Sequence, residues 1–217
     1  MRPTSQPTLS FDPSAKTAMD KQEPPAPGAD FRVVIVGAGN INFGSDEGPW
    51  NHSFRLEHKL GPRLKVVALI DPDAERARRV LKTKCQSFVL SAYKDTVVYP
   101  TFKDYMASVC AETYPHAVWV GSPPAFRGGT EPGRNLEQLL TAGLPNVPLF
   151  IEKPVSTGAV DQTFEVAKML EQNGSLVSVG YMLRYLKVVQ KMKQIIAEND
   201  LHVMAVNARY IMAYEHT

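Results

Sequence analysis

Short apolar runs alternate with amphipathic stretches along most of this 217-residue chain. Runs rich in β-branched residues are typical of strands buried on both faces of a parallel sheet. They predict strands at Val33–Val36, Val66–Ile70, Val97–Tyr99, Ala117–Gly121, Val147–Ile151 and Leu176–Gly180. The intervening stretches predict helices at Phe54–Leu60, Asp73–Lys84 (with Asp73 as the cap), Asp104–Glu112, Asn135–Ala142, Thr163–Gln172 and Leu186–Glu198. This alternation predicts an α/β fold, a doubly wound parallel sheet of the Rossmann type.

The pattern changes near the end of the chain. From Val203 to Tyr214 the apolar positions alternate with polar ones such as Asn207 and Arg209. A period of two predicts a long, half-buried strand of a second, mostly antiparallel sheet. One strand cannot make a sheet, so we expect either a partner on this strand, as in an oligomer, or a longer protein of which this is the front part. We therefore expect a Rossmann domain over residues 31–183 and the start of an incomplete α+β domain over residues 184–217.

The first 30 residues form a separate region that is polar and without periodicity. Its prolines are Pro3, Pro7, Pro13, Pro24, Pro25 and Pro27. The region has no apolar core of a secretion signal, and its single arginine, Arg2, argues against a mitochondrial presequence. A disordered tail is the prediction.

Composition narrows the classes of function. The 24 Lys and Arg residues nearly balance the 22 Asp and Glu residues and form no basic stripe, which argues against nucleic-acid binding. No apolar run approaches the roughly 18 residues of a membrane span. The two cysteines, Cys85 and Cys110, have no paired spacing, so we expect reduced thiols in a cytoplasmic protein. The five histidines show no metal-ligand spacing, and no metal site is predicted.

A glycine turn follows the first predicted strand. Val33–Val36 runs directly into Gly37-Ala38-Gly39. In a dinucleotide-binding βαβ unit, the first glycine permits the tight turn and the second lets the backbone approach a pyrophosphate. The next helix would offer free N–H groups to the phosphates. The alternative is a turn whose glycines serve backbone geometry only.

An acidic residue, Asp71, ends the second predicted strand. A carboxylate in this place can accept the hydroxyls of the adenosine ribose and would repel a 2′-phosphate, which favours NAD over NADP. Arg76, Arg78 and Arg79 follow closely and leave NADP as an alternative.

The chain departs from the usual dinucleotide-binding pattern. Asn42 stands where the third glycine is expected, and Asp71 lies farther on than the usual distance of about 20 residues. The excess is a stretch at residues 45–51, which predicts an inserted loop that displaces the helix Phe54–Leu60 or forms a flap over the phosphates. We expect Asn42 to loosen the contact between helix and strand.

Five motifs occur in order between Val33 and about Tyr214. They are Gly37-Ala38-Gly39, Ala68-Leu69-Ile70-Asp71-Pro72, Val118-Trp119-Val120-Gly121-Ser122-Pro123-Pro124, Phe150-Ile151-Glu152-Lys153-Pro154 and Val179-Gly180-Tyr181-Met182-Leu183-Arg184-Tyr185. With them the chain resembles the Gfo/Idh/MocA oxidoreductases, the glucose–fructose oxidoreductase and inositol dehydrogenase group. The Glu-Lys-Pro triplet, about 115 residues after the glycine turn, is the most specific of these signatures.

The resemblance implies roles for particular residues. Those implied to bind the nicotinamide cofactor are Gly37, Gly39, Asn40, Ile41, Asp71, Ser122, Pro123, Glu152 and Lys153. Lys153 would also be catalytic, holding or polarising a substrate hydroxyl while hydride leaves the carbon. Arg184 would lie at the domain junction, as a substrate contact or an interdomain salt bridge.

Two features separate the chain from an ordinary member of the group. The histidine usual a few residues after the fourth-strand proline is missing, since the chain there reads Ala125-Phe126-Arg127. The second domain, which carries the group's Asp and His, is nearly absent. We therefore weigh an NAD(P)-dependent dehydrogenase acting on a sugar-like or polyol hydroxyl against a non-catalytic nucleotide-binding module, as in a fungal galactose-pathway repressor. A remnant that neither folds nor acts is the third alternative.

Overall fold

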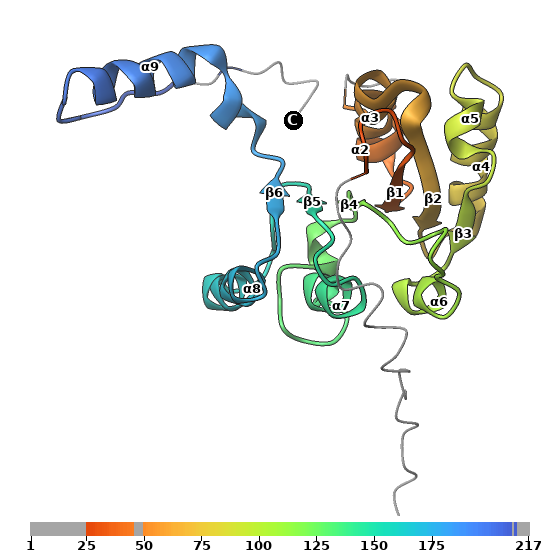
Figure 1. The fold of residues 1–217 in the computed structure, drawn as a ribbon. Coiled ribbons are helices and arrows are strands. Elements are labelled where there is room, and N and C mark those ends of the chain that lie inside the picture. The colour runs from red at the N-terminus through yellow and green to blue at the C-terminus, as the bar shows by residue number, and fades with distance from the viewer. Residues whose placement is uncertain (1–24, 46–49, 210, 212–217) are drawn as a thin grey trace, which may run out of the picture.

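A computed structural model describes residues 25–45, 50–209 and 211. Its centre is a six-stranded sheet in the order β3-β2-β1-β4-β5-β6, with every neighbouring pair parallel (Figure 1). The strands are β1 (Phe31–Val36), β2 (Leu64–Ile70), β3 (Val97–Tyr99), β4 (Ala117–Val120), β5 (Leu149–Ile151) and β6 (Val177–Val179). All six lie where apolar runs predict them, and the Rossmann-like α/β class is confirmed.

Helices cover both faces of the sheet. On one face lie α3 (His52–Leu60), α4 (Ala74–Cys85) and α5 (Leu90–Tyr93), and on the other lie α6 (Phe102–Met106), α7 (Leu136–Gly143) and α8 (Val160–Gln172). The central strand β1 supplies both cores, because Val33 and Ile35 face the first helix layer and Val34 and Val36 face the second. All four side chains are buried, which explains the unbroken apolar run.

Among the helices after β2, α5 and α6 differ most from expectation. α6 begins at Phe102 because Thr101 and Asp104 form a reciprocal capping box, and it ends at Met106 rather than at Glu112. α5 was not predicted, because its four residues are too few to show a helical period. The predicted cap of α4 is confirmed: the carboxylate of Asp73 accepts a hydrogen bond from the Arg76 N–H.

The first crossover helix is divided into two parts. A short helix, α2 (Asn40–Phe43), follows the glycine turn directly, and α3 begins at His52 after the inserted stretch. Residues 46–49 of that stretch lie outside the described residues, so the predicted flap stays a prediction. Asn51 caps α3, since its side-chain oxygen accepts from the Phe54 N–H at 2.9 Å.

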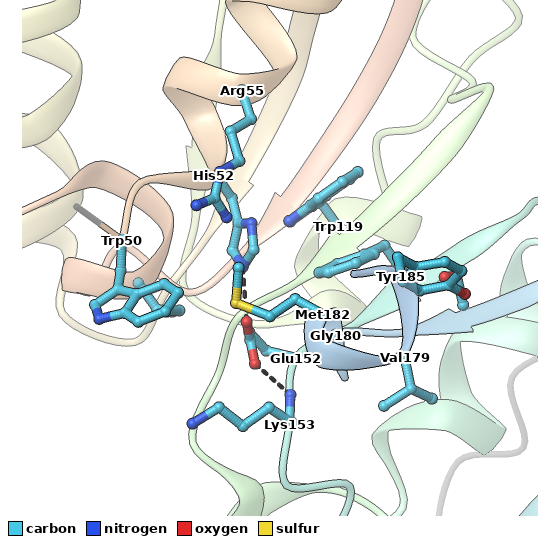
Figure 2. A pocket seen from close by; sticks show the side chains of 13 residues that line it. Trp50, His52, Arg55, Trp119, Glu152, Lys153, Val179, Gly180, Met182 and Tyr185 are labelled. Atoms are coloured by element: carbon cyan, nitrogen blue, oxygen red, sulfur yellow. Dashed lines mark hydrogen bonds and ion pairs between the residues drawn. The ribbon is translucent and has the colours of Figure 1, made fainter. Parts of the chain in front are cut away.

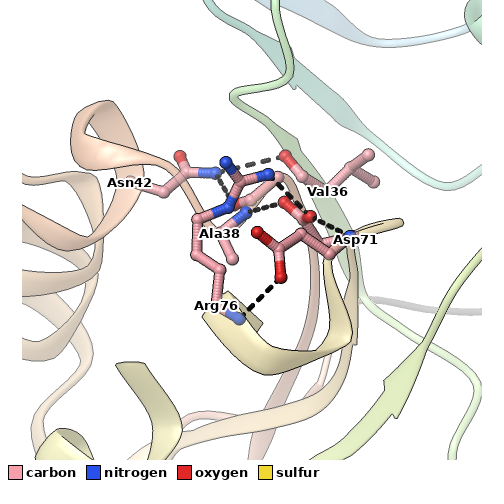
Figure 3. A network of polar contacts seen from close by, with 7 residues as sticks. Val36, Ala38, Asn42, Asp71 and Arg76 are labelled. Atoms are coloured by element: carbon pink, nitrogen blue, oxygen red, sulfur yellow. Dashed lines mark hydrogen bonds and ion pairs between the residues drawn. The ribbon is translucent and has the colours of Figure 1, made fainter. Parts of the chain in front are cut away.

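Asn42 tightens the glycine turn rather than loosening it, so that expectation was wrong. The side chain is fully buried, and its Nδ2 donates to the carbonyls of Val36 at 3.1 Å and Gly37 at 2.7 Å (Figure 3). Room for it comes from Gly121, where a Cβ would stand 2.4 Å from the Asn42 Oδ1. The amide therefore replaces the missing third glycine with two hydrogen bonds from α2 to the end of β1.

The predicted strand Val203–Tyr214 is not formed over residues 203–209. After the 3₁₀ turn η3 (Met182–Tyr185), α9 (Lys187–Glu198) projects from the sheet beyond β6, and residues 201–209 and 211 follow without regular structure (Figure 1). Strand hydrogen bonds require a neighbouring strand, and the described residues offer none here. Residues 210 and 212–217 lie outside the described residues. None of the residues of α9 is buried.

The described residues also bear on the sequence-based expectations about membrane spans, cysteines and metal ligands. Within them no helix has both the length and the apolar character needed to cross a bilayer. Cys85 and Cys110 are both free thiols. No group of three or more metal-binding side chains gathers among these residues.

Replacing Asn42 by Ala tests its role in holding the turn. The change removes the Asn42 donor from the Gly37 carbonyl and leaves the Val36 carbonyl with the Gly121 N–H alone, so we expect the free energy of unfolding to fall by about 2 kcal/mol. Urea unfolding followed by circular dichroism measures it. The matched control is Asn135→Ala, because Asn135 caps α7 without a side-chain hydrogen bond and its loss should change stability by at most about 0.5 kcal/mol. Equal stability of the two variants would contradict the assignment.

Candidate functional site

The candidate site lies where the chain reverses direction across the sheet. β1 and β4 are neighbours, and the connections that leave them run to opposite sides, which is where open α/β sheets bind ligands. Gly37 follows β1 with φ +97°, and a Cβ there would stand 3.0 Å from the Ser122 N beyond β4. The two strand ends can approach this closely only because residue 37 is glycine.

A crevice of about 380 Å³ opens above these strand ends. It is lined by Gly37, Gly39, Asn40, Ile41, Asp71, Arg76, Gly121, Ser122, Pro123, Pro124, Arg127, Glu152 and Lys153. Nothing stands within 4 Å of the place that a Cβ on Gly39 would take, so that space is open to a ligand. The backbone cradle and the open space beside it fit the phosphates of a dinucleotide.

Asp71 joins the second strand to the glycine turn (Figure 3). Its Oδ2 accepts from the Ala38 N–H at 2.6 Å, and its Oδ1 accepts from the Asp73 N–H and from Arg76 Nη2, each at 2.8 Å. An ionised carboxylate has about four acceptor positions, so one remains for a ligand hydroxyl. The Arg76 side chain is 44% exposed and lines the crevice, which leaves other guanidinium N–H groups facing solvent.

A second cavity, of about 300 Å³ and walled by aromatic rings, adjoins the crevice (Figure 2). The indole of Trp119 stacks on Phe150 with ring centroids 3.9 Å apart, and Trp50 borders the opening from the end of the inserted stretch. Ile41, Glu152 and Lys153 line both cavities. The Glu-Lys-Pro triplet therefore stands at the junction between the two.

Glu152 is buried at this junction and hydrogen bonded on both oxygens. Oε1 lies 2.9 Å from Nε2 of His52, and Oε2 accepts from the Lys153 N–H. Burial raises the pKa of Glu152, but the hydrogen bonds from His52 and the Lys153 N–H, together with nearby positive charge, outweigh it and hold the pKa below its usual value. Glu152 is therefore a carboxylate at neutral pH. The Lys153–Pro154 peptide that follows is cis.

Arg127 belongs to the segment after β4 that lacks the histidine expected from the resemblance. The side chain is 1% exposed, and it donates from Nε to the Ser122 carbonyl at 3.0 Å and from Nη1 to the Val155 carbonyl at 2.9 Å. It thereby ties the loop after β4 to the loop after β5. Arg127 also lines the crevice.

Nine of the ten residues predicted for the site lie together. All nine implied cofactor contacts, Gly37, Gly39, Asn40, Ile41, Asp71, Ser122, Pro123, Glu152 and Lys153, line the crevice. Arg184 is exposed within η3 and lines neither cavity, although its neighbours Met182 and Tyr185 line the aromatic one. The roles of these residues stay predictions.

Sequence reasoning missed the side-chain partners of Asp71 and Glu152, the two buried carboxylates that line the crevice. His52 lies 100 positions from Glu152, and no local pattern links them. Arg76 was noted only for its charge. Its position five residues after Asp71, near the start of a capped helix, could have indicated that it pairs with that carboxylate. Arg127 was noted only as a departure from the group.

Comparison with known proteins identifies the family. A model described as an oxidoreductase family with an NAD-binding Rossmann fold matches residues 31–181, and a model for an oxidoreductase C-terminal domain matches residues 184–217. The chain belongs to the Gfo/Idh/MocA family of oxidoreductases.

Two uncharacterized proteins of Schizosaccharomyces pombe are each 44% identical to the chain, over 191 and 198 residues. The matches cover 87% and 90% of this chain but 50% and 48% of those proteins. The chain therefore spans about half the length of the curated relatives it matches.

Solved structures share the fold at low sequence identity. The WlbA dehydrogenase of Chromobacterium violaceum, solved with NADH and UDP-GlcNAcA, has a TM-score of 0.57 at 17% identity over 82% of this chain and 43% of its own. The scyllo-inositol dehydrogenase of Lactobacillus casei, solved with NAD(H) and scyllo-inositol, has a TM-score of 0.54 at 19% identity over 79% and 42%. A super-repressor mutant of Gal80p from Saccharomyces cerevisiae has a TM-score of 0.56 at 16% identity over 78% and 39%.

Two buried carboxylates should respond to acid in opposite directions. The folded protein lowers the pKa of Glu152, so ionised Glu152 stabilises the fold above the ordinary Glu pKa of about 4.3. This stabilisation is lost as the pH falls below that value, so the wild type should lose stability relative to Glu152→Gln. Burial raises the pKa of Glu137, so relative to Glu137→Gln the wild type instead gains stability on acidification. Urea unfolding of the three proteins between about pH 6 and about pH 3.5 gives the slopes. Slopes of the same sign would contradict the assignment.

Proposed function

We propose that this chain is the cofactor-binding part of an NAD-dependent oxidoreductase that takes hydride from a hydroxyl-bearing carbon of a sugar-like or polyol substrate. The observation that carries the proposal is the continuity of the two cavities, which meet at Glu152 and Lys153. A dinucleotide in the glycine-turn crevice would thus reach the aromatic cavity where a substrate can lie.

Each part of the proposed site has a separate task. When bound, the nicotinamide supplies hydride acceptance. The turn at Gly37 and Gly39 holds the pyrophosphate against backbone N–H groups. Ser122 and Pro123 border the cofactor on the side of β4. The Lys153 side chain is exposed at the junction and holds the substrate hydroxyl, whose developing negative charge it stabilises.

We propose NAD as the cofactor in preference to NADP. Asp71 leaves one acceptor position for a ribose hydroxyl, and a 2′-phosphate in the same place would meet its negative charge. Arg76 offsets part of that charge, yet its Nη2 already donates to the Asp71 carboxylate. The preference for NAD therefore rests on Asp71, and the positive charge of Arg76 reduces the magnitude of that preference.

The proposal extends to the organisation of the protein. Residues 31–183 would form the cofactor domain, and residues 184–217 would begin an α+β domain that supplies most substrate contacts, with Arg184 at the junction. The chain spans about half of its curated relatives, which supports a second domain in the complete protein. The solved structures with scyllo-inositol and with UDP-GlcNAcA support a hydroxylated, sugar-like or polyol substrate.

A second candidate function is a nucleotide-binding regulatory module. It is favoured by the exposed apolar side chains of α9, among them Val188 and Met192, and by the shared fold with Gal80p. Such a module would bind the cofactor and a protein partner without turning over a substrate. Saturable NAD binding by the complete protein, together with no reduction of NAD across a panel of inositols and sugars, would favour it over the dehydrogenase.

Changing Asp71 to Asn tests the cofactor preference. The change removes the charge while keeping the shape, so we expect the ratio of the NADP and NAD dissociation constants to fall at least about tenfold. Calorimetric titration of wild type and variant with each cofactor measures the ratio. Asp95→Asn is the matched control, because that carboxylate is exposed and lines neither cavity. An unchanged ratio in Asp71→Asn would sink the assignment.

Changing Lys153 to Met tests its chemical role. In the complete protein, which adds the proposed substrate domain, we expect kcat to fall by about 100-fold or more, because the substrate hydroxyl loses its charged partner, while the dissociation constant of NAD changes by less than about threefold. Absorbance of the reduced nicotinamide reports turnover, and calorimetry reports binding. Lys168→Met, at an exposed position on α8, is the control. Full activity in Lys153→Met would remove Lys153 from the chemistry.

A further inference from the structure

The pairing of His52 with Glu152 joins two segments that are 100 residues apart. His52 is the first residue of α3, and Glu152 directly follows β5. The two side chains are only 6% and 9% exposed, and the contact measures 2.9 Å. Because the Glu152 carboxylate can only accept, the hydrogen between them resides on His52 Nε2.

The histidine ring is held in place from several sides. It meets Phe150 edge-on at 5.0 Å between ring centroids and lies 5.4 Å from Trp119. Its backbone is fixed by the Asn51 cap, whose oxygen also accepts from the Ser53 hydroxyl at 2.7 Å. The donor is therefore fixed in position before any ligand arrives.

The carboxylate of Glu152 is confined as closely as its partner. Oε2 accepts from the Lys153 N–H, and a Cβ on Gly180 would stand 3.0 Å from Oε1. Glu152 also feels the positive charge of the Lys153 ammonium, although no ion pair joins the two among the described residues. His52 and Lys153 are thus alternative partners for one carboxylate, and His52 holds it (Figure 2).

We infer that His52 is a positioning residue that keeps Lys153 available for the substrate by holding the Glu152 carboxylate away from it. The inference rests on the proposed function, in which Lys153 meets the substrate hydroxyl. Without the His52 donor, Glu152 keeps its negative charge but loses its buried partner. Two cations act on Glu152: Arg127, whose guanidinium already donates to two backbone carbonyls, and the flexible Lys153, which can replace the lost partner. An ammonium paired with Glu152 neither enters the aromatic cavity nor binds a hydroxyl there.

Competitive labelling of the amines with acetic anhydride tests this without cofactor or substrate. The rate at Lys153 is measured by mass spectrometry relative to Lys168 in the 217-residue chain. An ammonium that gains a carboxylate partner releases its proton less readily, so His52→Leu should slow labelling of Lys153 by about tenfold or more. His52→Gln, whose amide nitrogen takes the place of Nε2, should stay within about twofold of wild type.

Further variants separate this role from a general loss of structure. His52→Asn is polar but too short to reach Glu152, so it should label as slowly as His52→Leu. Adding Glu152→Gln to His52→Leu should restore the rate, because the competing charge is gone. Equal rates at Lys153 in wild type, His52→Leu and His52→Asn, with all three folded by urea unfolding, would overturn the inference. Equally slow labelling in His52→Gln and His52→Leu would also overturn it.

Titration of the wild-type chain with NADH distinguishes this inference from the proposed function. Suppose that labelling is slow in His52→Leu and rescued in His52→Gln, but the folded wild type does not bind NADH. The role of His52 would then stand, and the proposed cofactor site would be rejected. NADH binding combined with unchanged labelling would retain the cofactor site and remove the role of His52.

Discussion

Close approach of two backbone segments makes the crevice. The turn at Gly37 meets the segment after β4 at a distance that admits no side chain, and Gly121 gives up its own side-chain volume to the amide of Asn42. Asn42 then binds the carbonyls that end β1. A side chain at residue 37 would push apart the ends of β1 and β4, and a side chain at residue 121 would displace the Asn42 amide. The geometry of the crevice therefore depends on the missing side chains of Gly37 and Gly121 and on the buried amide of Asn42.

Two buried carboxylates organise the crevice in the same way. Asp71 after β2 and Glu152 after β5 each accept a backbone N–H on one oxygen and a side-chain donor on the other. In each case the backbone bond fixes a loop that lines the crevice. The side-chain partners come from two different crossovers: His52 from α3, between β1 and β2, and Arg76 from α4, between β2 and β3. Charge-assisted hydrogen bonds of this kind are about twice as strong as neutral ones, which suits loops that must stay ordered at a ligand site.

The sequence predicted what depends on local order and missed what depends on distant pairing. The six strands, the Asp73 cap and the place of the Glu-Lys-Pro triplet directly after the fifth strand follow from apolar runs and short motifs, and the structure has them at those positions. The pairing of His52 with Glu152 leaves no mark on either segment, and the place of Asn42 depends on a glycine nearly 80 residues away. The alternating pattern after Val203 predicted a strand. Such a pattern fits a strand with one buried and one exposed face, which needs a neighbouring strand to pair with. The described residues provide no such neighbour for residues 203–209.

A crystal structure of the chain grown with NADH tests the central claim most directly. The account predicts the pyrophosphate against the turn at Gly37 and Gly39, a ribose hydroxyl on Asp71, and the nicotinamide near Ile41 and Lys153 where the two cavities meet. Density for the dinucleotide elsewhere on the fold, or an empty crevice in crystals saturated with NADH, would contradict it.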